Sequence, residues 1–320
     1  MINSGTDPLP CPAAILVATD LGDLDRLMPF ALQQAAQTGA RLFLLHVVAT
    51  PAPLSVDAVD MPFYDVSAAL EYAEATLKPY CDAARRRQIP CDVVVREGQA
   101  TQQILAAARQ FHADRILLGT RSRSRLGKML LGSVAEQVLR SVNLPVITVD
   151  PEAHLPVQSG FEEHVVLHAT TLRETSRPSA ALACQFAAGM KSKLVLLHVL
   201  PPIDEMRRHG LPTGLDSAAM HQLRRLAAET ASGCSLGPGL DVEPMVVHGN
   251  PFIEILAAAS ERSACLIVLG ANHRSAFENL TRDRTVYRVL AHARCPVLTL
   301  REPQAALDGV RPERVAAFRS

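Results

Sequence analysis

Two patterns of hydrophobic positions alternate along this chain. Short, continuous apolar runs of strand length are separated by longer stretches in which apolar residues return at helical spacing. Continuous apolar runs are typical of parallel strands that are covered on both faces. In the first half the predicted strands are residues 14–19, 42–48, 92–96, 115–119 and 145–149, and the predicted helices are residues 24–37, 66–87, 99–111 and 133–142. The alternation predicts a doubly wound α/β sheet, whose ligand site lies beyond the carboxyl ends of the strands.

The same order of predicted strands and helices occurs in both halves of the sequence. Gly119, which ends an apolar run, returns 151 residues later as Gly270, and ARLFLLHVV at residues 40–48 matches SKLVLLHVL at residues 192–200. Self-similarity over this length indicates a duplicated domain, because solenoid and propeller repeats span roughly 20–50 residues. We therefore expect two tandem five-stranded domains, residues 1–150 and residues 151–320, with the boundary in residues 150–160.

The second half is expected to carry its strands at residues 165–169, 194–199, 242–247, 265–270 and 296–300. Prolines punctuate residues 50–61 and 201–217, which we expect to be irregular, and the tail from Arg301 is polar. The last strands of the two halves are short and apolar, so each alone would leave an unpaired sheet edge. We expect these two edges to pair antiparallel, which makes the halves a pseudo-twofold pair; the same edges could also join two chains as a homodimer.

Composition excludes several classes of protein. Thirty-two basic and 32 acidic residues leave a formal charge of zero, so no overall field attracts nucleic acid or an anionic membrane. The amino terminus lacks the pattern of a signal peptide, and no apolar stretch is long enough to span a bilayer, so we expect a cytoplasmic protein. Seven cysteines without a C-x-x-C pair argue against a disulfide framework or a structural zinc site, and we expect Cys265 and Cys295 to be buried, reduced thiols.

The first half carries a pattern typical of an anion site. A strand ends at Gly119, a basic loop follows, and a helix opens with Gly132, Ser133 and Val134. Glycine at a strand end allows a close backbone approach, and a helix amino terminus offers unpaired N–H groups to a phosphate. The loop contains four basic side chains, which either contact phosphate or form a solvated surface: Arg121, Arg123, Arg125 and Lys128.

With these residues the sequence resembles the universal stress protein family. Nucleotide-binding members of that family carry Gly-x-x-Gly, nine residues, then Gly-Ser or Gly-Thr after a strand that ends in glycine. Gly119, Gly132 and Ser133 fit this spacing, whereas Ser122 stands where the second glycine would be. The resemblance extends to Asp20 at the end of the first strand, L-H-V at residues 45–47, G-S-V-A-E at residues 132–136 and the final Pro-Val strands, and it covers both halves.

The resemblance implies a Rossmann-like fold of the adenine nucleotide alpha hydrolase type that binds ATP, either alone or together with Mg²⁺. In such a domain the position of Asp20 contacts ribose or metal, the backbone at Val47 meets adenine, and the glycine-rich segment holds the phosphates. The resulting candidate nucleotide site consists of Asp20, Val47, Gly119, Ser122, Arg123, Gly132, Ser133 and Val134. An adenine nucleotide and a protein client are the implied partners.

Two of these residues also have purely structural interpretations. Asp20 could cap a helix that begins near Asp23. Ser133 and Glu136 form S-x-x-E, the sequence signature of a capping box.

The second half differs where the chemistry should lie. Thr171 replaces Asp20, His273 replaces Ser122, and Asp283 followed by Arg284 replaces the Gly-Ser pair. An aspartate at that helix terminus would repel a phosphate, so we expect this copy to have lost nucleotide binding. Three histidines near predicted strand ends either converge on a metal or are scattered: His168, His248 and His273.

Three functions fit this pattern. The first is a stress-response protein in which the nucleotide acts as a regulatory signal. The second is a slow ATP-hydrolysing or adenylating enzyme, although D-L-G-D-L-D after the first strand lacks the S-G-G-x-D-S loop of pyrophosphate-loop enzymes, and no nucleophile–base pair stands out. The third is an interaction scaffold without a ligand.

Ser122 provides a test of the phosphate loop. If serine at this turn must adopt a left-handed backbone conformation, Ser122→Gly should tighten nucleotide binding by about 1 kcal/mol. Isothermal titration with ATP measures the change. Weaker binding by the variant would instead identify the Ser122 hydroxyl as a phosphate donor.

Overall fold

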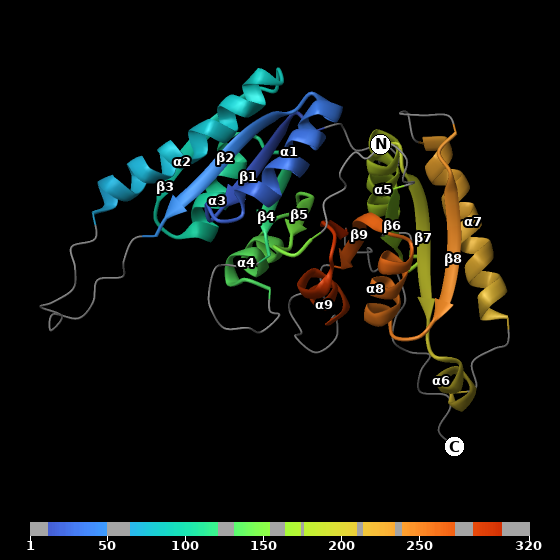
Figure 1. Ribbon diagram of the computed structural model, residues 1–320. Coiled ribbons are helices and arrows are strands. Elements are labelled where there is room, and N and C mark those ends of the chain that lie inside the picture. Colours follow the sequence, from blue (N-terminus) through green and yellow to red (C-terminus); the bar gives the residue numbers. More distant parts are fainter. Residues whose placement is uncertain are drawn as a thin grey trace, which may run out of the picture.

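The computed structural model describes residues 12–49, 65–120, 131–153, 164–173, 176–209, 214–233, 239–272 and 284–302. The first half comprises β1 (Ala14–Thr19), α1 (Leu24–Thr38), β2 (Arg41–Val48), α2 (Val66–Arg86), β3 (Cys91–Glu97), α3 (Ala100–Gln110), β4 (Arg115–Gly119), α4 (Ser133–Ser141) and β5 (Val146–Val149). The second half comprises β6 (Val165–Ala169), α5 (Arg177–Met190), β7 (Lys193–Leu200), α6 (Ile203–Arg208), α7 (Leu215–Gly233), β8 (Val242–His248), α8 (Pro251–Glu261), β9 (Ala264–Asn272), α9 (Arg284–His292) and β10 (Val297–Glu302) (Figure 1).

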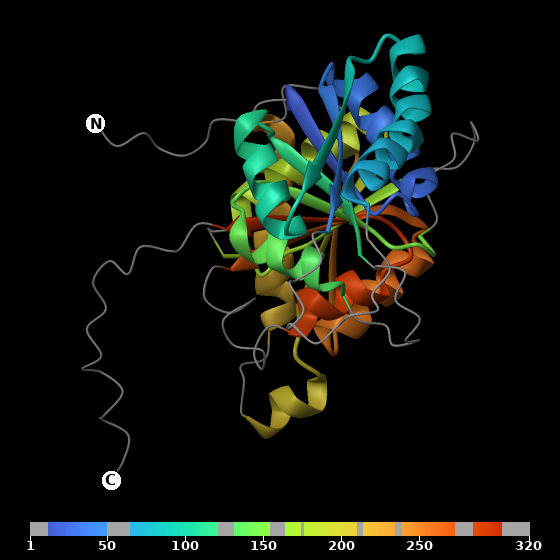
Figure 2. The same cartoon turned by 90° about the vertical axis from the view of Figure 1, so that its left-hand side faces the viewer.

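All of these strands form one ten-stranded sheet in the order β3-β2-β1-β4-β5-β10-β9-β6-β7-β8. Neighbouring strands within each half are parallel. Side chains of α1, α2, α5 and α7 pack on one face of the sheet, and side chains of α3, α4, α8 and α9 pack on the other. Figure 2 shows the ribbon of the same molecule turned by 90°. The predicted fold class, two doubly wound five-stranded units, is therefore confirmed.

The prediction that residues 201–217 are irregular is wrong. Helix α6 occupies Ile203–Arg208, and α7 already begins at Leu215. The two prolines at the start of this segment follow the end of β7 but do not prevent a helix. Pro202 is the N-cap of α6, where no N–H group is needed, and its carbonyl accepts from the N–H of Met206 at 3.0 Å. Acidic residues in the first turn of α6 and arginines in its last turn also favour the helix electrostatically. The predictions for residues 50–61 and for the tail beyond Glu302 lie outside the described residues.

Prolines also set the starts of the two strands at the centre of the sheet. Pro145 and Pro296 lack an N–H group and stand just before β5 and β10. Their carbonyl groups still accept ladder bonds, from the N–H groups of Ile116 and Ile267, each at 3.0 Å. Each strand therefore begins one residue later than predicted, while the pairing with its neighbour starts at the proline.

The two halves meet through β5 and β10, which pair antiparallel as predicted. Ile147 lies opposite Leu298, and these two residues occupy the same position in the two copies. On either side, Thr148 pairs with Val297 and Val146 pairs with Thr299. In the duplication Val146 corresponds to Val297 and Thr148 to Thr299, so the twofold exchanges these two pairs. The register therefore places a pseudo-twofold axis between Ile147 and Leu298, and no strand edge remains at the centre of the molecule.

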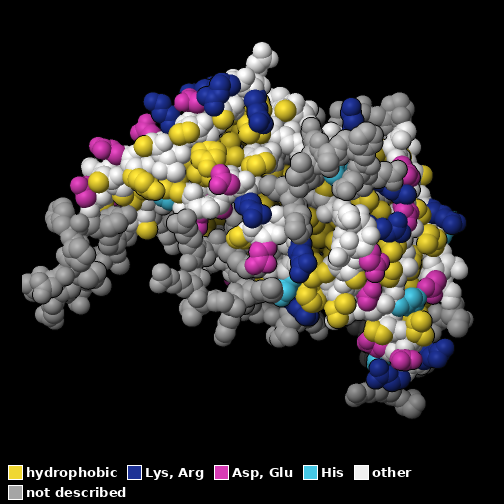
Figure 3. Space-filling model, viewed as in Figure 1, with side chains coloured by type: hydrophobic (Ala, Val, Ile, Leu, Met, Phe, Trp, Pro, Cys, Tyr) yellow, Lys and Arg dark blue, Asp and Glu magenta, His cyan; other side chains and the backbone are white. Residues whose placement is uncertain are grey.

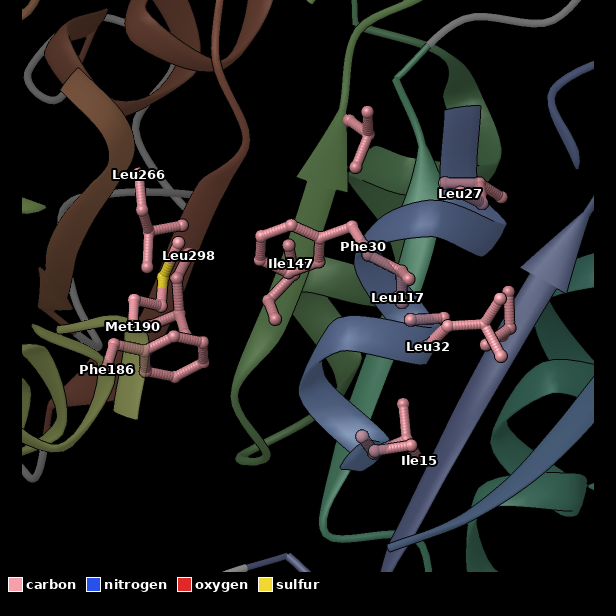
Figure 4. Close-up of a cluster of buried hydrophobic side chains, with 14 of the residues drawn as sticks. Ile15, Leu27, Phe30, Leu32, Leu117, Ile147, Phe186, Met190, Leu266 and Leu298 are labelled. Carbon is pink, nitrogen blue, oxygen red and sulfur yellow. The ribbon is translucent and has the colours of Figure 1, made fainter. Parts of the chain in front are cut away.

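One apolar cluster continues across this joint. Ile147 of β5 and Leu298 of β10 lie in the same buried cluster, to which Phe30 of α1 and Phe186 of α5 also belong (Figure 4). The guanidinium of Arg115, at the start of β4, lies 4.3 Å from the centroid of the Phe186 ring. Its Nη1 also donates to Oε1 of Gln34 at 2.8 Å. A buried cation of the first half thus packs against an aromatic ring of the second.

Ile147→Lys tests whether the central joint stabilises the whole chain. The Ile147 side chain is 1% exposed, so lysine would bury a charge at the axis, and we expect the free energy of unfolding to fall by about 3–5 kcal/mol. Chemical denaturation followed by circular dichroism measures the loss. Ile253→Lys is the matched control, because Ile253 is 55% exposed on α8, and it should be within about 0.5 kcal/mol of wild type. Equal midpoints for the two variants would contradict the assignment.

Candidate functional site

A cavity of about 190 Å³ opens at the carboxyl ends of β1, β2 and β4. The chain leaves β1 toward one face of the sheet and leaves β4 toward the other, so a crevice remains between them. The lining residues are Ala18, Thr19, Asp20, Asp23, Leu45, His46, Val47, Ala100, Ile104, Leu118, Gly119, Thr120, Gly132, Ser133, Val134 and Ala135.

One wall of the cavity is apolar. Val47 of β2 lies there with Ala100 and Ile104, which are one turn apart on α3. Gly98, with φ +127°, allows the chain to turn from β3 into α3 and so places this face of the helix at the cavity. Next to Val47, Nδ1 of His46 donates to the carbonyl of Thr19 at 2.9 Å and so holds β2 against the end of β1.

A second part of the lining is the amino terminus of α4. Gly132 is the N-cap residue, in an extended conformation, and Ser133 is the first residue of the helix. Because Ser133 lies inside the helix, the predicted capping box is wrong: no side chain caps α4, and Glu136 instead bonds Arg140 at 2.6 Å. Backbone N–H groups at such a terminus favour an anion.

Asp20 lies at the rim of the cavity, in the turn between β1 and α1. Its Oδ1 accepts from the N–H of Gly22 at 2.8 Å, while Leu21 adopts a left-handed conformation with φ 71°. Helix α1 begins at Leu24 and its N-cap is Asp23, so the interpretation of Asp20 as a helix cap is wrong. The exposed side chain of Asp20 instead stabilises the turn that faces the cavity.

Asp23 is the residue that the sequence analysis missed. Its side chain makes no cap bond to α1; Oδ1 accepts from the hydroxyl of Thr19, and Oδ2 lies over Gly119 where a Cβ would otherwise be. Burial, the largest cause, and repulsion by Asp20 raise the pKa of Asp23 to about 6, although the Thr19 hydrogen bond acts against this. The signal was present in D-L-G-D-L-D, where Asp23 follows the predicted site residue Asp20 by three positions.

The cavity brings together six of the eight predicted site residues, namely Asp20, Val47, Gly119, Gly132, Ser133 and Val134. They come from β1, β2, β4 and α4 or from the turns at their ends. Ser122 and Arg123 lie outside the described residues, as do the other basic residues of that loop.

The second half reproduces the backbone of the turn, with Thr171 at the position of Asp20. The hydroxyl of Thr170 accepts from the N–H of Leu172 at 3.1 Å, as that of Thr19 accepts from Leu21 at 2.9 Å, and both leucines are left-handed. Thr171, at the position of Asp20, shares a hydrogen bond of 3.1 Å with Ser176. Asp283 and His273 lie outside the described residues.

Of the three predicted histidines, the structure describes His168 and His248 and places them apart. His168 lies in β6, fully buried, with Nδ1 donating to the Val268 carbonyl at 3.1 Å, and burial lowers its pKa to about 4. His248 lies at the end of β8, with β7 between the two strands, and pairs with Asp216. In the described ranges no group of three His, Cys, Asp or Glu side chains could hold a metal ion.

The cysteines within the described ranges are free and buried. Burial raises the pKa of Cys265 to about 11 and that of Cys295 to about 12, so both thiols are protonated near neutral pH. The expectation of buried, reduced thiols is confirmed for these two residues.

The face of the molecule seen in Figure 3 shows no single-sign charge field. Acidic and basic side chains are interspersed over the face seen in Figure 3, in agreement with the balanced composition. Among the helices that the structure describes, none has the length and apolar character needed to cross a bilayer.

Fold and cavity together define a tandem, doubly wound α/β protein with a ligand crevice in its first half. A family model described as the universal stress protein family matches residues 13–150 and again residues 164–301. The chain therefore belongs to the universal stress protein family, with two such domains in one polypeptide.

Relatives of both one and two domains resemble this chain. A universal stress protein from Mycolicibacterium smegmatis is 25% identical over 328 residues, which cover 94% of this chain and 99% of the relative. One from Thermus aquaticus is 32% identical over 139 residues, 42% of this chain and 96% of the relative. The crystal structure of a universal stress protein from Archaeoglobus fulgidus shares the fold, with a TM-score of 0.67 at 22% identity. The match covers 91% of this chain and 99% of the Archaeoglobus chain.

The raised pKa of Asp23 predicts a pH-dependent cost in stability. Because the folded-state pKa of about 6 exceeds the ordinary value of 3.8, the wild type should lose stability as the pH rises from about 4 to above 6. Asp23→Asn removes this titration, so its stability relative to wild type should rise by about 1–3 kcal/mol between pH 4 and pH 7. Urea denaturation at the two pH values measures the difference. The control is Asp25→Asn, which removes an exposed carboxylate two residues away; an equal response of both variants would contradict the assignment.

Proposed function

We propose that this protein is a stress-response protein that binds one ATP per chain, in the cavity of its first half. The observation that carries the proposal is the convergence of Asp20, Val47, Gly119 and the amino terminus of α4 on one cavity. These are the positions that resemble the nucleotide site of the family, and three separate crossover connections are needed to bring them together.

Each wall of the cavity suits one part of the nucleotide. The apolar wall of Val47, Ala100 and Ile104 would hold the adenine ring, with the Val47 backbone meeting its polar edge. The exposed carboxylate of Asp20, at the rim, would accept from a ribose hydroxyl. The N–H groups at Gly132 and Ser133 would hold the phosphates. Mg²⁺ would enter with the phosphates, since Mg²⁺ is usually held by substrate phosphates, water and few protein ligands.

The second half would serve as the partner of the first and not as a second nucleotide site. Thr171 and Ser176 offer hydroxyl groups where the first half has Asp20, and the sequence places Asp283 at the start of α9 where Gly132 stands in α4. The pairing of β5 with β10 would then do within one chain what a homodimer of single-domain chains would do between two. In the cytoplasm, the nucleotide state of the first half would regulate binding of a protein client.

Gly132→Asp tests the phosphate end of the site in the full-length chain. Aspartate is a favourable N-cap residue, so α4 should form, but its carboxylate would face the phosphates. Isothermal titration with ATP should show one site in the wild type and at least tenfold weaker binding in the variant. Gly132→Asn has nearly the same shape without the charge and should bind within a few-fold of wild type. Unchanged affinity in Gly132→Asp, or two sites per wild-type chain, would contradict the assignment.

A further inference from the structure

Gly119 leaves room for a carboxyl group of the protein itself. The sequence pattern assigns this glycine to close approach of a ligand, yet a Cβ at Gly119 would collide with Oδ2 of Asp23. The same carboxyl accepts from the Thr19 hydroxyl through Oδ1, so the carboxyl group lies between the ends of β1 and β4. Asp23 can therefore occupy one end of the cavity because residue 119 is a glycine and has no side chain.

The position of Asp23 puts it in competition with a phosphate. Asp23 and the amino terminus of α4 line the same cavity of about 190 Å³. A cavity of this volume is on the order of 7 Å across. Two unit charges at that separation near a protein surface repel or attract each other strongly enough to change an affinity by more than about tenfold. An ionised Asp23 would thus oppose the anion that the N–H groups of α4 favour.

The surroundings of Asp23 hold its carboxyl in the protonated form at mildly acidic pH. Burial and the neighbouring Asp20 raise its pKa to about 6, which lies close to neutral pH. A protonated carboxyl keeps the contact with Thr19, because it can donate to or accept from a hydroxyl. The titratable side chains on the elements around it are Asp20 of the turn, Asp25 and Arg26 of α1, His46 of β2, Glu136 and Arg140 of α4, and Asp150 after β5.

Several of these groups already have partners of their own. Asp25 accepts from the Tyr80 hydroxyl at 2.7 Å, Arg26 donates to the Ala153 carbonyl at 3.1 Å, and Asp150 accepts from Thr120 at 3.0 Å. Asp20 is the charged group that acts on Asp23, and it acts as a like charge.

We propose that Asp23 makes nucleotide binding in the first half dependent on protons: the ionised carboxylate excludes the phosphates from the Gly119 end of the cavity, and the protonated carboxyl admits them. This inference rests on the proposed nucleotide site and adds its regulation. Acidification of the cell would load the protein with nucleotide, and a return to neutral pH would release it.

The test is the affinity of the full-length protein for ATP at pH 5.5 and pH 7.5, measured by isothermal titration for wild type and Asp23→Asn. If only the protonated form binds, a pKa of about 6 weakens wild-type binding about 20-fold over this interval. Asp23→Asn should lack this factor and bind at pH 7.5 nearly as tightly as at pH 5.5. Titration of the ATP phosphates is common to both proteins, so the ratio of the wild-type affinity to the variant affinity at each pH isolates the effect of Asp23.

Two controls separate the charge effect from a general one. Asp25→Asn removes a carboxylate from the first turn of α1, two residues after Asp23, and should retain the wild-type pH dependence. Adenosine, which carries no phosphate, should bind the wild type with the same affinity at both pH values. The carboxyl resonance of Asp23, followed by NMR in the absence of any ligand, should titrate near pH 6.

The outcomes distinguish this inference from the proposed function. ATP binding with the same pH dependence in wild type and Asp23→Asn would overturn the role of Asp23 and leave the nucleotide site intact. A carboxyl that titrates near pH 4 would overturn it as well. Absence of ATP binding by either protein at pH 5.5 would overturn the proposed function itself.

Discussion

The antiparallel pairing of β5 with β10 is the interaction on which the rest of this structure depends. Each half ends in a short apolar strand, and an open edge of that kind would invite association with other chains. Joining the two edges converts two five-stranded sheets into one sheet of ten and lets the apolar cluster under α1 continue under α5. The register, with Ile147 opposite Leu298, follows from the duplication, because only equivalent residues can meet on a twofold axis.

The crossover connections around this sheet create the site. Helix α1 follows β1 and helix α4 follows β4; the two strands are neighbours, but the two helices lie on opposite faces of the sheet. A crevice therefore opens between the ends of β1 and β4. The crevice has an apolar wall from β2 and α3 and a polar wall from the amino terminus of α4. A ligand with an apolar ring at one end and negative charge at the other matches this arrangement.

The two copies show how one backbone can be given different chemistry. Both carry a threonine whose hydroxyl accepts from a left-handed leucine two residues on, and in both a histidine of the second strand donates to the carbonyl of that threonine. These shared contacts do not involve the side chain of the residue between threonine and leucine, which is Asp20 in one half and Thr171 in the other. The residue at this position can thus differ between the copies while the shared threonine, leucine and histidine contacts are kept.

The sequence alone determined the strands, the duplication and six of the residues that line the candidate site. Apolar runs define buried parallel strands, and residues such as Gly119 and Gly132 lie at strand and helix ends, which local pattern reveals. It misjudged Ser133, because the signature of a capping box does not show which residue begins the helix. Only the tertiary structure decided that Asp23 lies over Gly119, since this contact joins a turn after the first strand to the end of the fourth. The raised pKa of that carboxyl follows from its burial, a property that exists only once the strands have been placed side by side.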